Sequence, residues 1–520
     1  MRRPRYREYA RCPVDVRSTA SLALARGYSH AIWMSHHSHR RVTPTSTDGA
    51  SAGTRTPPTS VVWFRRDLRV DDHPALNAAA ARGGVVCLFV VDPGILGRRH
   101  HHAPARLRFL NAGLQALDTD LRERGSRLVI RHGDPRQIVP EVAAAAGADH
   151  VHVTRELSPL GRARDAQVQQ ALTTMGVVFA QYGGDLMVAP EDLPGPEGAG
   201  YRVFTPFYGA WSKEVFVTAP ADAPDELRGP ELPADDLATL MPQGAPLAPA
   251  GQTAARDRLR RFAADDADYY RDERDIVANP TTSRLSPYLR FGMCTASQIA
   301  RQLGLPKPLE PGAEAFWRQV AWREFFHHLL WWRPEAARGA LQPQFRNIRW
   351  DNGQAHIAAW TDGLTGFPLV DAAMRQLADT GWIHNRARMV AGSFLVKDLL
   401  VDWRIGERIF MQRLIDGDPA SNNGGWQWVA GTGTDAAPYF RVINPILQAK
   451  KFDPEGIYVK RHVPELRRVP EEHIHEPWRM DAELQKRIGC RIGTDYPAPI
   501  VDHLQRRRIA IARYKDATTT

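Results

Sequence analysis

The feature that most restricts the fold is a change of hydrophobic pattern along the chain. Between residues 60 and 181, short apolar segments alternate with longer segments in which apolar residues recur with the 3.6-residue period of a helix. After about residue 251, all the periodic segments have the helical period. We therefore predict a doubly wound parallel sheet with α/β connectivity, followed by an all-α region.

The predicted elements follow this pattern in order. We expect strands at 61–64, 85–91, 127–131, 150–154 and 177–181, separated by helices at 74–81, 105–124, 140–146 and 165–175. In the second region we expect helices at 254–268, 297–301, 313–332, 368–380, 385–401, 406–415 and 499–515. No glycine-rich dinucleotide-binding loop follows the first strand and no P-loop motif occurs, so the α/β region lacks the usual nucleotide-binding motifs.

Composition divides the rest of the chain. Residues 1–58 are rich in Arg, His, Ser, Thr and Pro without periodicity, which predicts a disordered extension or a start codon placed too early, with Met34 as the alternative start. Residues 59–185 form the predicted α/β domain and 186–250 a proline-rich connector, in which the aromatic segment 202–215 is expected to pack as a short helix. Residues 251–515 form the predicted all-α domain.

Overall composition excludes several classes of protein. The net charge of +10 and the pI of about 9.6 are compatible with a polyanionic partner such as nucleic acid. Four cysteines without a CxxC pair support neither a zinc site nor a disulfide framework, and no apolar run is long enough to span a membrane. Of the 14 tryptophans, most lie in the helical region.

The most unusual segment is 414–428, with the sequence LIDGDPASNNGGWQW. Gly424 and Gly425 remove side-chain bulk, so a flat group can approach the backbone there. Trp426 and Trp428 point to opposite sides of an extended segment and lie about 200° apart on a helix. The alternative is a well-packed loop with a helix cap at Asp418.

Three further segments carry polar groups that bind ligands in other proteins. The hydroxyls of 281–286 precede a helix and can form a phosphate seat or a plain N-cap. On the helix at 313–332, Gln319 and Trp322 share one face. Arg386 and Arg388 point to different sides of their helix, so one can pair with Asp416 or Asp418 while the other faces a polyanion; a purely structural ion-pair network is the alternative.

Seven segments taken together resemble the DNA photolyase/cryptochrome family, and within it class I cyclobutane pyrimidine dimer photolyases. The resemblance runs from about residue 60 to about residue 511. The segments that carry it are 62–69, 282–286, 322–325, 385–389, 394–400, 416–428 and 431–445.

The resemblance implies a helical domain that holds FAD in a bent shape, with reduced FADH⁻ as the active form. Arg388 would pair with Asp416 beside the isoalloxazine ring, and Asn422 would face the flavin N5. The implied FAD contacts are Tyr270, Thr282, Ser283, Arg284, Leu285, Ser286, Arg323, Asn385, Arg388, Asp416, Gly417, Asp418 and Asn422.

The implied reaction is the light-driven repair of pyrimidine dimers in DNA, in which excited FADH⁻ donates one electron to a flipped-out dimer. The implied electron path runs through Trp426, Trp403 and Trp350. The implied lesion contacts are Gln319, Trp322, Met389 and Trp428. The implied phosphate contacts are Arg274, Arg386 and Arg441.

The chain departs from the family pattern in two places. Gln319 stands where many bacterial members carry a Glu that hydrogen-bonds the lesion, while Met389 favours the dimer-repairing branch. The segment 154–165 lacks the Asn-Glu pair of a folate binder, so the second, antenna chromophore is expected to be a deazaflavin rather than methenyltetrahydrofolate.

Two other functions compete with repair. A cryptochrome-like blue-light photoreceptor would signal through partners, and a third reading is a flavoprotein that binds DNA without repairing it. The retained Trp322, Met389 and Trp428 and the short segment after the last predicted helix favour repair. We expect a monomer that does not bind membranes and acts in the bacterial cytoplasm, at the nucleoid when bound to DNA.

Overall fold

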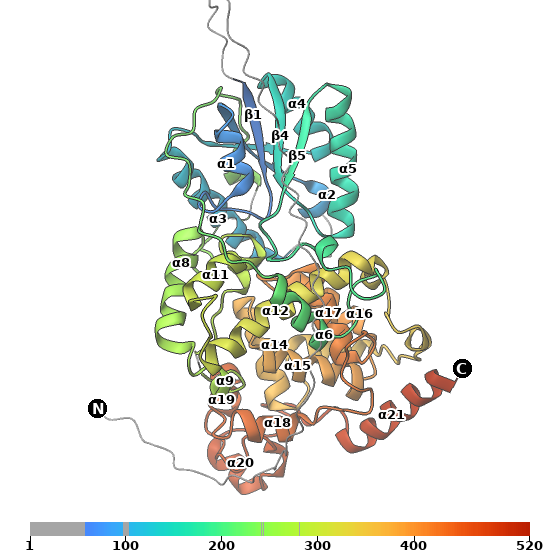
Figure 1. Ribbon diagram of the computed structural model, residues 1–520. Helices are drawn as coiled ribbons and strands as arrows, with labels where there is room; N and C mark the ends of the chain where they lie inside the picture. Colours follow the sequence, from blue (N-terminus) through green and yellow to red (C-terminus); the bar gives the residue numbers. More distant parts are fainter. Residues whose placement is uncertain (1–57, 97–102, 241, 243, 280, 520) are drawn as a thin grey trace, which may run out of the picture. The chain divides into compact units, whose positions relative to one another are not determined.

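The computed structural model describes residues 58–96, 103–240, 242, 244–279 and 281–519 (Figure 1). The extension predicted for 1–58, including Met34, therefore lies outside the described residues except for Pro58. Residues 56–520 group into one compact unit. The boundaries predicted at 185 and 250 stay predictions.

Five parallel strands form the sheet: β1 (Thr59–Phe64), β2 (Gly84–Val91), β3 (Leu128–His132), β4 (Ala148–Thr154) and β5 (Val178–Tyr182). All five predicted strands are confirmed, with ends shifted by one or two residues. The strand order is β3-β2-β1-β4-β5, so the chain reverses its direction of winding between β1 and β4. Ligands of open α/β sheets bind outside the carboxyl ends of the strands at such a point.

Helices cover both faces of the sheet. On β1, Val62 and Phe64 face α1 (Pro74–Ala80) and α3 (Pro104–Arg122), while Val61 and Trp63 face α4 (Pro135–Ala145) and α5 (Pro159–Thr174). A short α2 (Pro93–Leu96) follows β2.

Two helix starts were predicted wrongly. We expected α4 to begin at 140 and α5 at 165, but they begin at Pro135 and Pro159. Both begin with a proline after a capping residue, Asp134 or Ser158, whose side chain accepts a backbone N–H. Proline suits the first helical position because its missing N–H would have no helical partner there. In both cases the capping residue followed by proline indicates the helix start in the sequence.

The connector contains η1 (Pro190–Asp192), α6 (Phe204–Glu214) and α7 (Leu237–Leu240). The helix expected at 202–215 is therefore confirmed as α6. It buries Phe204, Phe207 and Trp211 against α12 (Pro311–Trp332). The connector is thus joined to the helical region by an aromatic core.

The helical region contains every helix that the periodicity predicted, with some changed ends. Its first part comprises α8 (Gln252–Arg261), the π-helical turn η2 (Phe262–Asp266), α9 (Tyr270–Glu273), α10 (Ser286–Arg290), α11 (Ala296–Leu303), α12, η3 (Pro334–Ala337), η4 (Pro343–Asn347), α13 (Gln354–Asp362) and α14 (Pro368–Thr380). Its second part comprises α15 (Asn385–Ser393), the π-helical turn η5 (Phe394–Asp398), α16 (Trp403–Arg413), α17 (Pro419–Ala430), α18 (Pro445–Phe452), α19 (Ile457–His462), η6 (Pro464–Leu466), η7 (Pro477–Arg479), α20 (Ala482–Ile488) and α21 (His503–Thr519).

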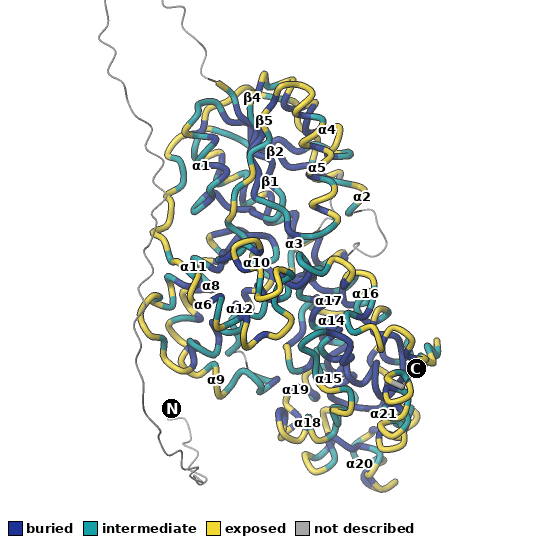
Figure 2. Tube along the Cα trace, turned by 45° about the vertical axis from the view of Figure 1, so that its right-hand side comes forward, coloured by how far each residue is buried: buried dark blue, intermediate teal, exposed yellow. Residues whose placement is uncertain are grey.

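Two hydrophobic cores connect these elements (Figure 2). The first joins the α1/α3 face of the sheet to α6, α8, α11 and α12. The second lies among α14, α15, α16, α17 and α19. Because the first core contains residues of the sheet, the connector and the helical region, the connector packs as part of the fold.

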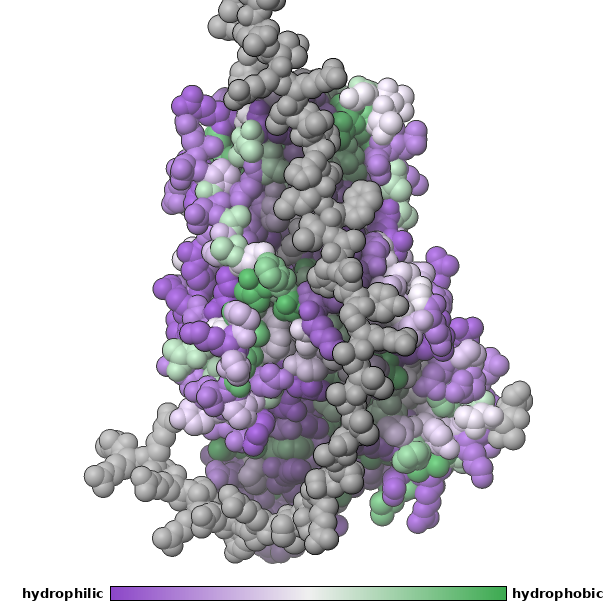
Figure 3. All heavy atoms as spheres, viewed as in Figure 1, coloured by the Kyte–Doolittle hydropathy of each residue, from purple (hydrophilic) through white to green (hydrophobic). Residues whose placement is uncertain are grey.

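One face of the molecule is mostly polar. The face drawn in Figure 3 is largely hydrophilic, with smaller hydrophobic areas between. No helix in the described part of the chain is both long enough and apolar enough to cross a membrane.

Candidate functional site

The segment 414–428 is largely a helix. Asp418 caps the N-terminus of α17 by accepting hydrogen bonds from Ala420 N at 3.0 Å and Ser421 N at 2.9 Å, and Pro419 occupies the first helical position. The alternative of a well-packed loop with a helix cap at Asp418 is therefore confirmed for the cap and wrong for the loop from Pro419 onward. Helical geometry places Trp426 in the core and leaves Trp428 partly exposed.

The two glycines of α17 have different surroundings. A Cβ on Gly424 would lie 2.6 Å from Cε1 and Cγ of Phe326 on α12, so the flat group against Gly424 is a phenyl ring of the chain itself. A Cβ on Gly425 would meet no atom within 4 Å. The space beside Gly425 is therefore open to a ligand, whereas Gly424 serves the packing of two helices.

Asp416 joins three of the segments that the sequence singled out. Its Oδ2 accepts hydrogen bonds from Arg388 Nη2 at 2.8 Å and from Ser286 Oγ at 2.6 Å. The predicted pair of Arg388 and Asp416 is thus present. Oδ1 of Asp416 is buried without a hydrogen-bond partner among the described residues. A buried carboxylate oxygen needs a donor, so this atom fits a ligand N–H or O–H.

The segment before α10 has the character of a polar seat. Arg258 donates to Ser283 O at 2.7 Å and to Thr282 O at 2.6 Å, which fixes the backbone. The hydroxyls of Thr281 and Thr282 are buried and have no partner in the described structure. Arg284 adopts a φ of +50°, a left-handed conformation that is uncommon for a residue other than glycine. The fixed backbone leaves two hydroxyl groups for a ligand.

Asn422 is held by α16. Its Nδ2 donates to Glu407 O at 3.0 Å, and Asn423 Nδ2 donates to Glu407 Oε1 at 3.3 Å. An amide that donates through its nitrogen leaves its oxygen as an acceptor. No sequence pattern singled out Glu407, and burial raises the pKa of its carboxyl group to about 7.

Three of the implied FAD contacts also take part in a buried ion-pair network at the carboxyl end of β1. Arg323 pairs with Asp185 at 2.6 Å, and Gly417 O accepts a hydrogen bond from Arg290 Nε at 2.7 Å. Asp418 pairs with Arg66, which follows β1, at 3.1 Å. These groups therefore already have protein partners.

Charges hold this network in its ionised form. Burial alone would raise the pKa of Asp418, but His327, Arg290 and Arg66 hold it well below its usual range. Arg66 also lies 2.9 Å from Glu156, the residue that follows β4 by two positions. Asp418 consequently keeps its negative charge at the N-terminus of α17, where an anion is favoured by the helix dipole.

The remaining implied FAD contacts lie in separate settings. Tyr270 is half-buried, with its ring 5.9 Å from that of Phe262 and 5.3 Å from that of Phe316. Leu285 is buried in the first hydrophobic core. Asn385 is exposed on the first turn of α15, with Nδ2 3.7 Å from Met389 Sδ.

Trp426, Trp403 and Trp350 lie in neighbouring elements. The indole of Trp426 packs against Gly406 of α16, where a Cβ would lie 2.5 Å from Cζ3, and Trp403 begins the same helix. The segment that carries Trp350 is tied to the turn before α16, because Asp351 N donates to Leu400 O at 2.8 Å. Trp426 and Trp403 are buried and Trp350 is half-buried, so Trp350 is the one of the three that reaches the surface.

The implied lesion contacts are distributed over three helices. Gln319 and Trp322 lie on α12, Met389 on α15 and Trp428 on α17, and Met389, Trp322 and Trp428 are all partly exposed. Gln319 Nε2 donates to Ala315 O at 3.4 Å, near the long limit for a hydrogen bond.

The three arginines proposed for phosphate differ in their present contacts. Arg386 pairs with Asp275 at 2.8 Å and lies 4.5 Å over the ring of Phe452. Arg441 is exposed and Arg274 is half-buried. Asp275 was not singled out in the sequence, and its distance along the chain from Arg386 explains why.

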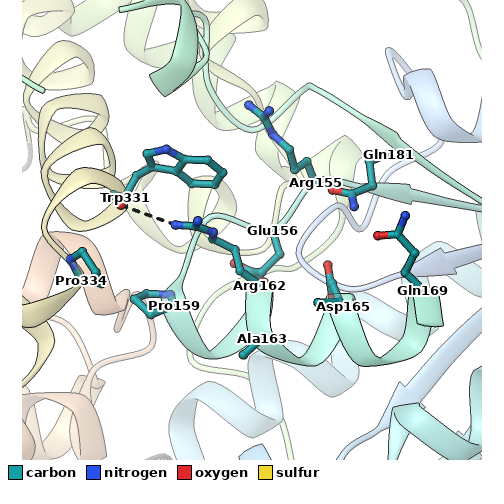
Figure 4. A pocket seen from close by; sticks show the side chains of 11 residues that line it. Arg155, Glu156, Pro159, Arg162, Ala163, Asp165, Gln169, Gln181, Trp331 and Pro334 are labelled. Atoms are coloured by element: carbon teal, nitrogen blue, oxygen red, sulfur yellow. Dashed lines mark hydrogen bonds between the residues drawn. The ribbon is translucent and has the colours of Figure 1, made fainter. Parts of the chain in front are cut away.

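A second candidate site is a cavity of about 570 Å³ beside the switch point of the sheet (Figure 4). Figure 4 shows Arg162 lying between Trp331, at the end of α12, and Glu156. The guanidinium of Arg162 is 3.7 Å from the centre of the Trp331 ring and that of Arg155 is 5.4 Å from it. Asp165 is already paired with Arg65 and Arg164. Arg155 pairs with Glu191 at 3.2 Å, whereas Arg162 has no carboxylate partner among the described residues. The guanidinium of Arg162 over the Trp331 ring therefore favours a flat, anionic ligand.

Two family models match the chain, one in each of its two regions. Residues 60–225 match the family model described as DNA photolyase, and residues 316–516 match that of the FAD binding domain of DNA photolyase. The polar seat fits FAD in its hydrogen-bonding groups, because the unpaired hydroxyls of Thr281 and Thr282 can donate and the unpaired Oδ1 of Asp416 can accept. The fold and site define a flavoprotein of the photolyase and cryptochrome architecture.

Relatives identify the family. A deoxyribodipyrimidine photo-lyase of Agrobacterium fabrum is 39% identical over 470 residues, which cover 87% of this chain and 97% of that protein. The crystal structure of a bacterial class III photolyase from Agrobacterium tumefaciens is 38% identical with a TM-score of 0.85, covering 91% of this chain and 100% of the other. A cryptochrome of Synechocystis is 30% identical with a TM-score of 0.82, covering 88% and 99%. The chain belongs to the DNA photolyase family.

Proposed function

We propose that this chain repairs cyclobutane pyrimidine dimers in DNA by light-driven one-electron transfer from reduced FAD. The activity would be that of a deoxyribodipyrimidine photo-lyase, a carbon–carbon lyase, which is the name of the curated relative. The observation that carries the proposal is the meeting of Ser286, Arg388 and Asp416, which assembles a polar seat from three distant segments. Reduced FAD, when bound there, supplies the electron on absorbing light.

The chain's own groups would orient the cofactor. The Asp416 carboxylate, with Oδ1 unpaired, would accept a hydrogen bond from it, and the hydroxyls of Thr281 and Thr282 would donate to it. Asn422 would present its side-chain oxygen, because its nitrogen is engaged by Glu407 O. An amide oxygen at that place accepts from a protonated ring nitrogen, which favours the reduced cofactor over the oxidised one.

The lesion would be held between aromatic side chains on two helices. A dimer has to leave the base stack to reach a buried cofactor, and this costs less for a damaged pair because it stacks poorly. Trp322 on α12 and Trp428 on α17 would hold it by stacking, which is worth about 1–3 kcal/mol per base. Gln319 would exchange its long bond to Ala315 O for one to the lesion, and Met389 would pack beside it.

DNA outside the lesion would be held by charge. Arg274, Arg386 and Arg441 would contact phosphates, so binding should weaken with salt and depend little on sequence. We propose that the enzyme acts as a monomer in the cytoplasm.

Trp426, Trp403 and Trp350 would carry electrons from the surface to oxidised FAD and thereby return it to the reduced state. The partial exposure of Trp350, next to the buried Trp403 and Trp426, supports electron entry at Trp350. Trp360 and Phe410, with ring centres 6.2 and 4.9 Å from that of Trp426, add aromatic neighbours.

A second chromophore would occupy the cavity beside the switch point. Arg162, which lies over the Trp331 ring, supports a flat anion there, and the absence of an Asn-Glu pair in 154–165 favours a deazaflavin over methenyltetrahydrofolate. Absorption and fluorescence of the chromophore released from purified protein would identify it.

One experiment separates repair from the alternative function of a blue-light photoreceptor. That alternative is tested because the structure is similar to that of a cryptochrome. The holoenzyme is illuminated with dimer-containing DNA under reducing conditions, and the remaining dimers are counted. We expect dimers to disappear only in the light. Unchanged dimer content with reduced FAD bound would exclude repair and favour signalling.

A further inference from the structure

The indole of Trp322 already carries one stacked ring. Phe204, the first residue of α6 in the connector, lies with its ring centre 3.9 Å from that of Trp322 and the two planes 7° apart. Phe204 is only 3% exposed, whereas Trp322 is partly exposed. Phe204 therefore covers one face of the indole, and a further flat group can stack only on the opposite face.

Phe204 is itself firmly placed. Its backbone N donates to Asp435 Oδ2 at 2.8 Å, which ties the start of α6 to the loop after α17. Further along α6, Tyr208 Oη donates to Glu314 Oε1 and Trp211 Nε1 donates to Glu324 Oε2, both at 2.7 Å and both on α12. The helix is thus fastened to α12 on either side of Trp322.

This arrangement has a consequence for binding. A long side chain that must adopt one rotamer on binding loses about 0.5–1.5 kcal/mol of affinity through ordering, unless the protein has already fixed it. A parallel ring 3.9 Å away fixes the plane of Trp322 before any ligand arrives. A base that stacks on the free face then extends an existing stack of two rings.

We propose that Phe204 is a positioning residue for lesion recognition, which acts by holding Trp322 in the plane that receives the flipped-out pyrimidine dimer. The proposal rests on the proposed function, because it takes Trp322 as a wall of the lesion site. It assigns to the connector a part in substrate discrimination. Phe204 itself would touch neither the lesion nor the cofactor and would act through Trp322.

The test compares dark binding of the holoenzyme to two oligonucleotides, one with a single thymine dimer and one undamaged. In Phe204→Leu the stack is lost, and we expect a roughly two- to twelvefold higher Kd for dimer DNA, since an aromatic pair is worth about 0.5–1.5 kcal/mol. The Kd for undamaged DNA should not change, because the phosphate contacts lie elsewhere. Phe204→Tyr keeps the flat ring and should bind dimer DNA as the wild type does.

Phe207→Leu is the matched control. Phe207 lies one turn later on α6, is fully buried, and has its ring 5.3 Å from that of Phe325 and 5.1 Å from that of His328. Its replacement removes the same volume from the same helix without removing the stack on Trp322. We expect a lowered Tm with an unchanged Kd for dimer DNA.

Equal binding of dimer DNA by Phe204→Leu and the wild type would overturn the proposal, and so would an equal loss in Phe207→Leu. If Phe204→Leu does not fold, Phe204→Met, which keeps bulk but not the flat ring, takes its place with the same expected loss. Failure of the proposed function has a different pattern, because the wild type would then show no preference for dimer DNA or Trp322→Ala would bind it unchanged.

Discussion

The packing of α12 against α17 can be tested with two adjacent glycines. A methyl group on Gly424 would lie 2.6 Å from Cε1 and Cγ of Phe326 and closer still to Cδ1, so the ring or the helix must move by more than about 1 Å to restore van der Waals contact. A methyl group on Gly425 would meet nothing within 4 Å. Both replacements gain the same helix propensity, about 1 kcal/mol in favour of Ala.

The difference between the two variants therefore isolates the packing at Phe326. Overpacking of a close-packed contact costs about 1–3 kcal/mol, so Gly424→Ala should be less stable than Gly425→Ala by about that amount. Gly425→Ala should itself be about 1 kcal/mol more stable than the wild type in the apoprotein. The assay is urea unfolding of the apoproteins followed by circular dichroism.

Because the ring of Phe326 lies 5.5 Å from that of Trp322, displacement of Phe326 should reach the lesion wall. Gly424→Ala should therefore also weaken dark binding of dimer DNA. A Gly424→Ala protein as stable as Gly425→Ala would refute the reasoning, since it would mean that the two helices can separate at no cost.

Three further outcomes are expected. Trp426→Phe should stop photoreduction of oxidised FAD while pre-reduced enzyme still repairs dimers, measured by flavin absorbance and dimer counts; unchanged photoreduction would contradict the electron path. Burial lowers the pKa of Lys397 to about 7, which is below its value in the unfolded chain. Between about pH 7 and 10 the unfolded state therefore binds one proton more than the folded state. The free energy of unfolding should rise across that range by up to about 4 kcal/mol. Lys397→Met should lack this rise, and parallel pH profiles of the two proteins would rule the effect out. Arg441→Ala should lower the salt slope of DNA binding by about 1, and Arg386→Ala by less because Asp275 already neutralises Arg386; equal slopes in all three proteins would count against the phosphate contacts.

The sequence predicted most securely what depends on local pattern. The strands of the sheet are apolar runs bounded by turn residues, and α14 was predicted with both ends correct, at 368 and 380. The helix α17 was missed because two asparagines and two glycines give it a composition typical of a loop. It forms because Asp418 caps it and because Gly424 lets it pack closely on Phe326.

Partners between distant residues were beyond local reasoning. Sequence alone offered Arg388 two acidic partners, Asp416 and Asp418, and the resemblance selected Asp416. Asp418 pairs with Arg66, a residue 352 positions earlier. Likewise the ring on Trp322 comes from the connector, whose aromatic segment indicated packing but not the surface on which it packs.

The pairing of Arg66 with Asp418 has a consequence for dividing the protein. Arg66 belongs to the turn after β1, and its carboxylate partners Glu156 and Asp418 come from the loop after β4 and from the cap of α17. A helical half expressed alone would leave the Asp418 carboxylate without this cation, and breaking a buried ion pair costs about 3–5 kcal/mol. The sheet and the cofactor-binding helices are therefore not interchangeable modules, and a chimera that grafts one onto a relative's other half would have to carry the residues of this junction with it.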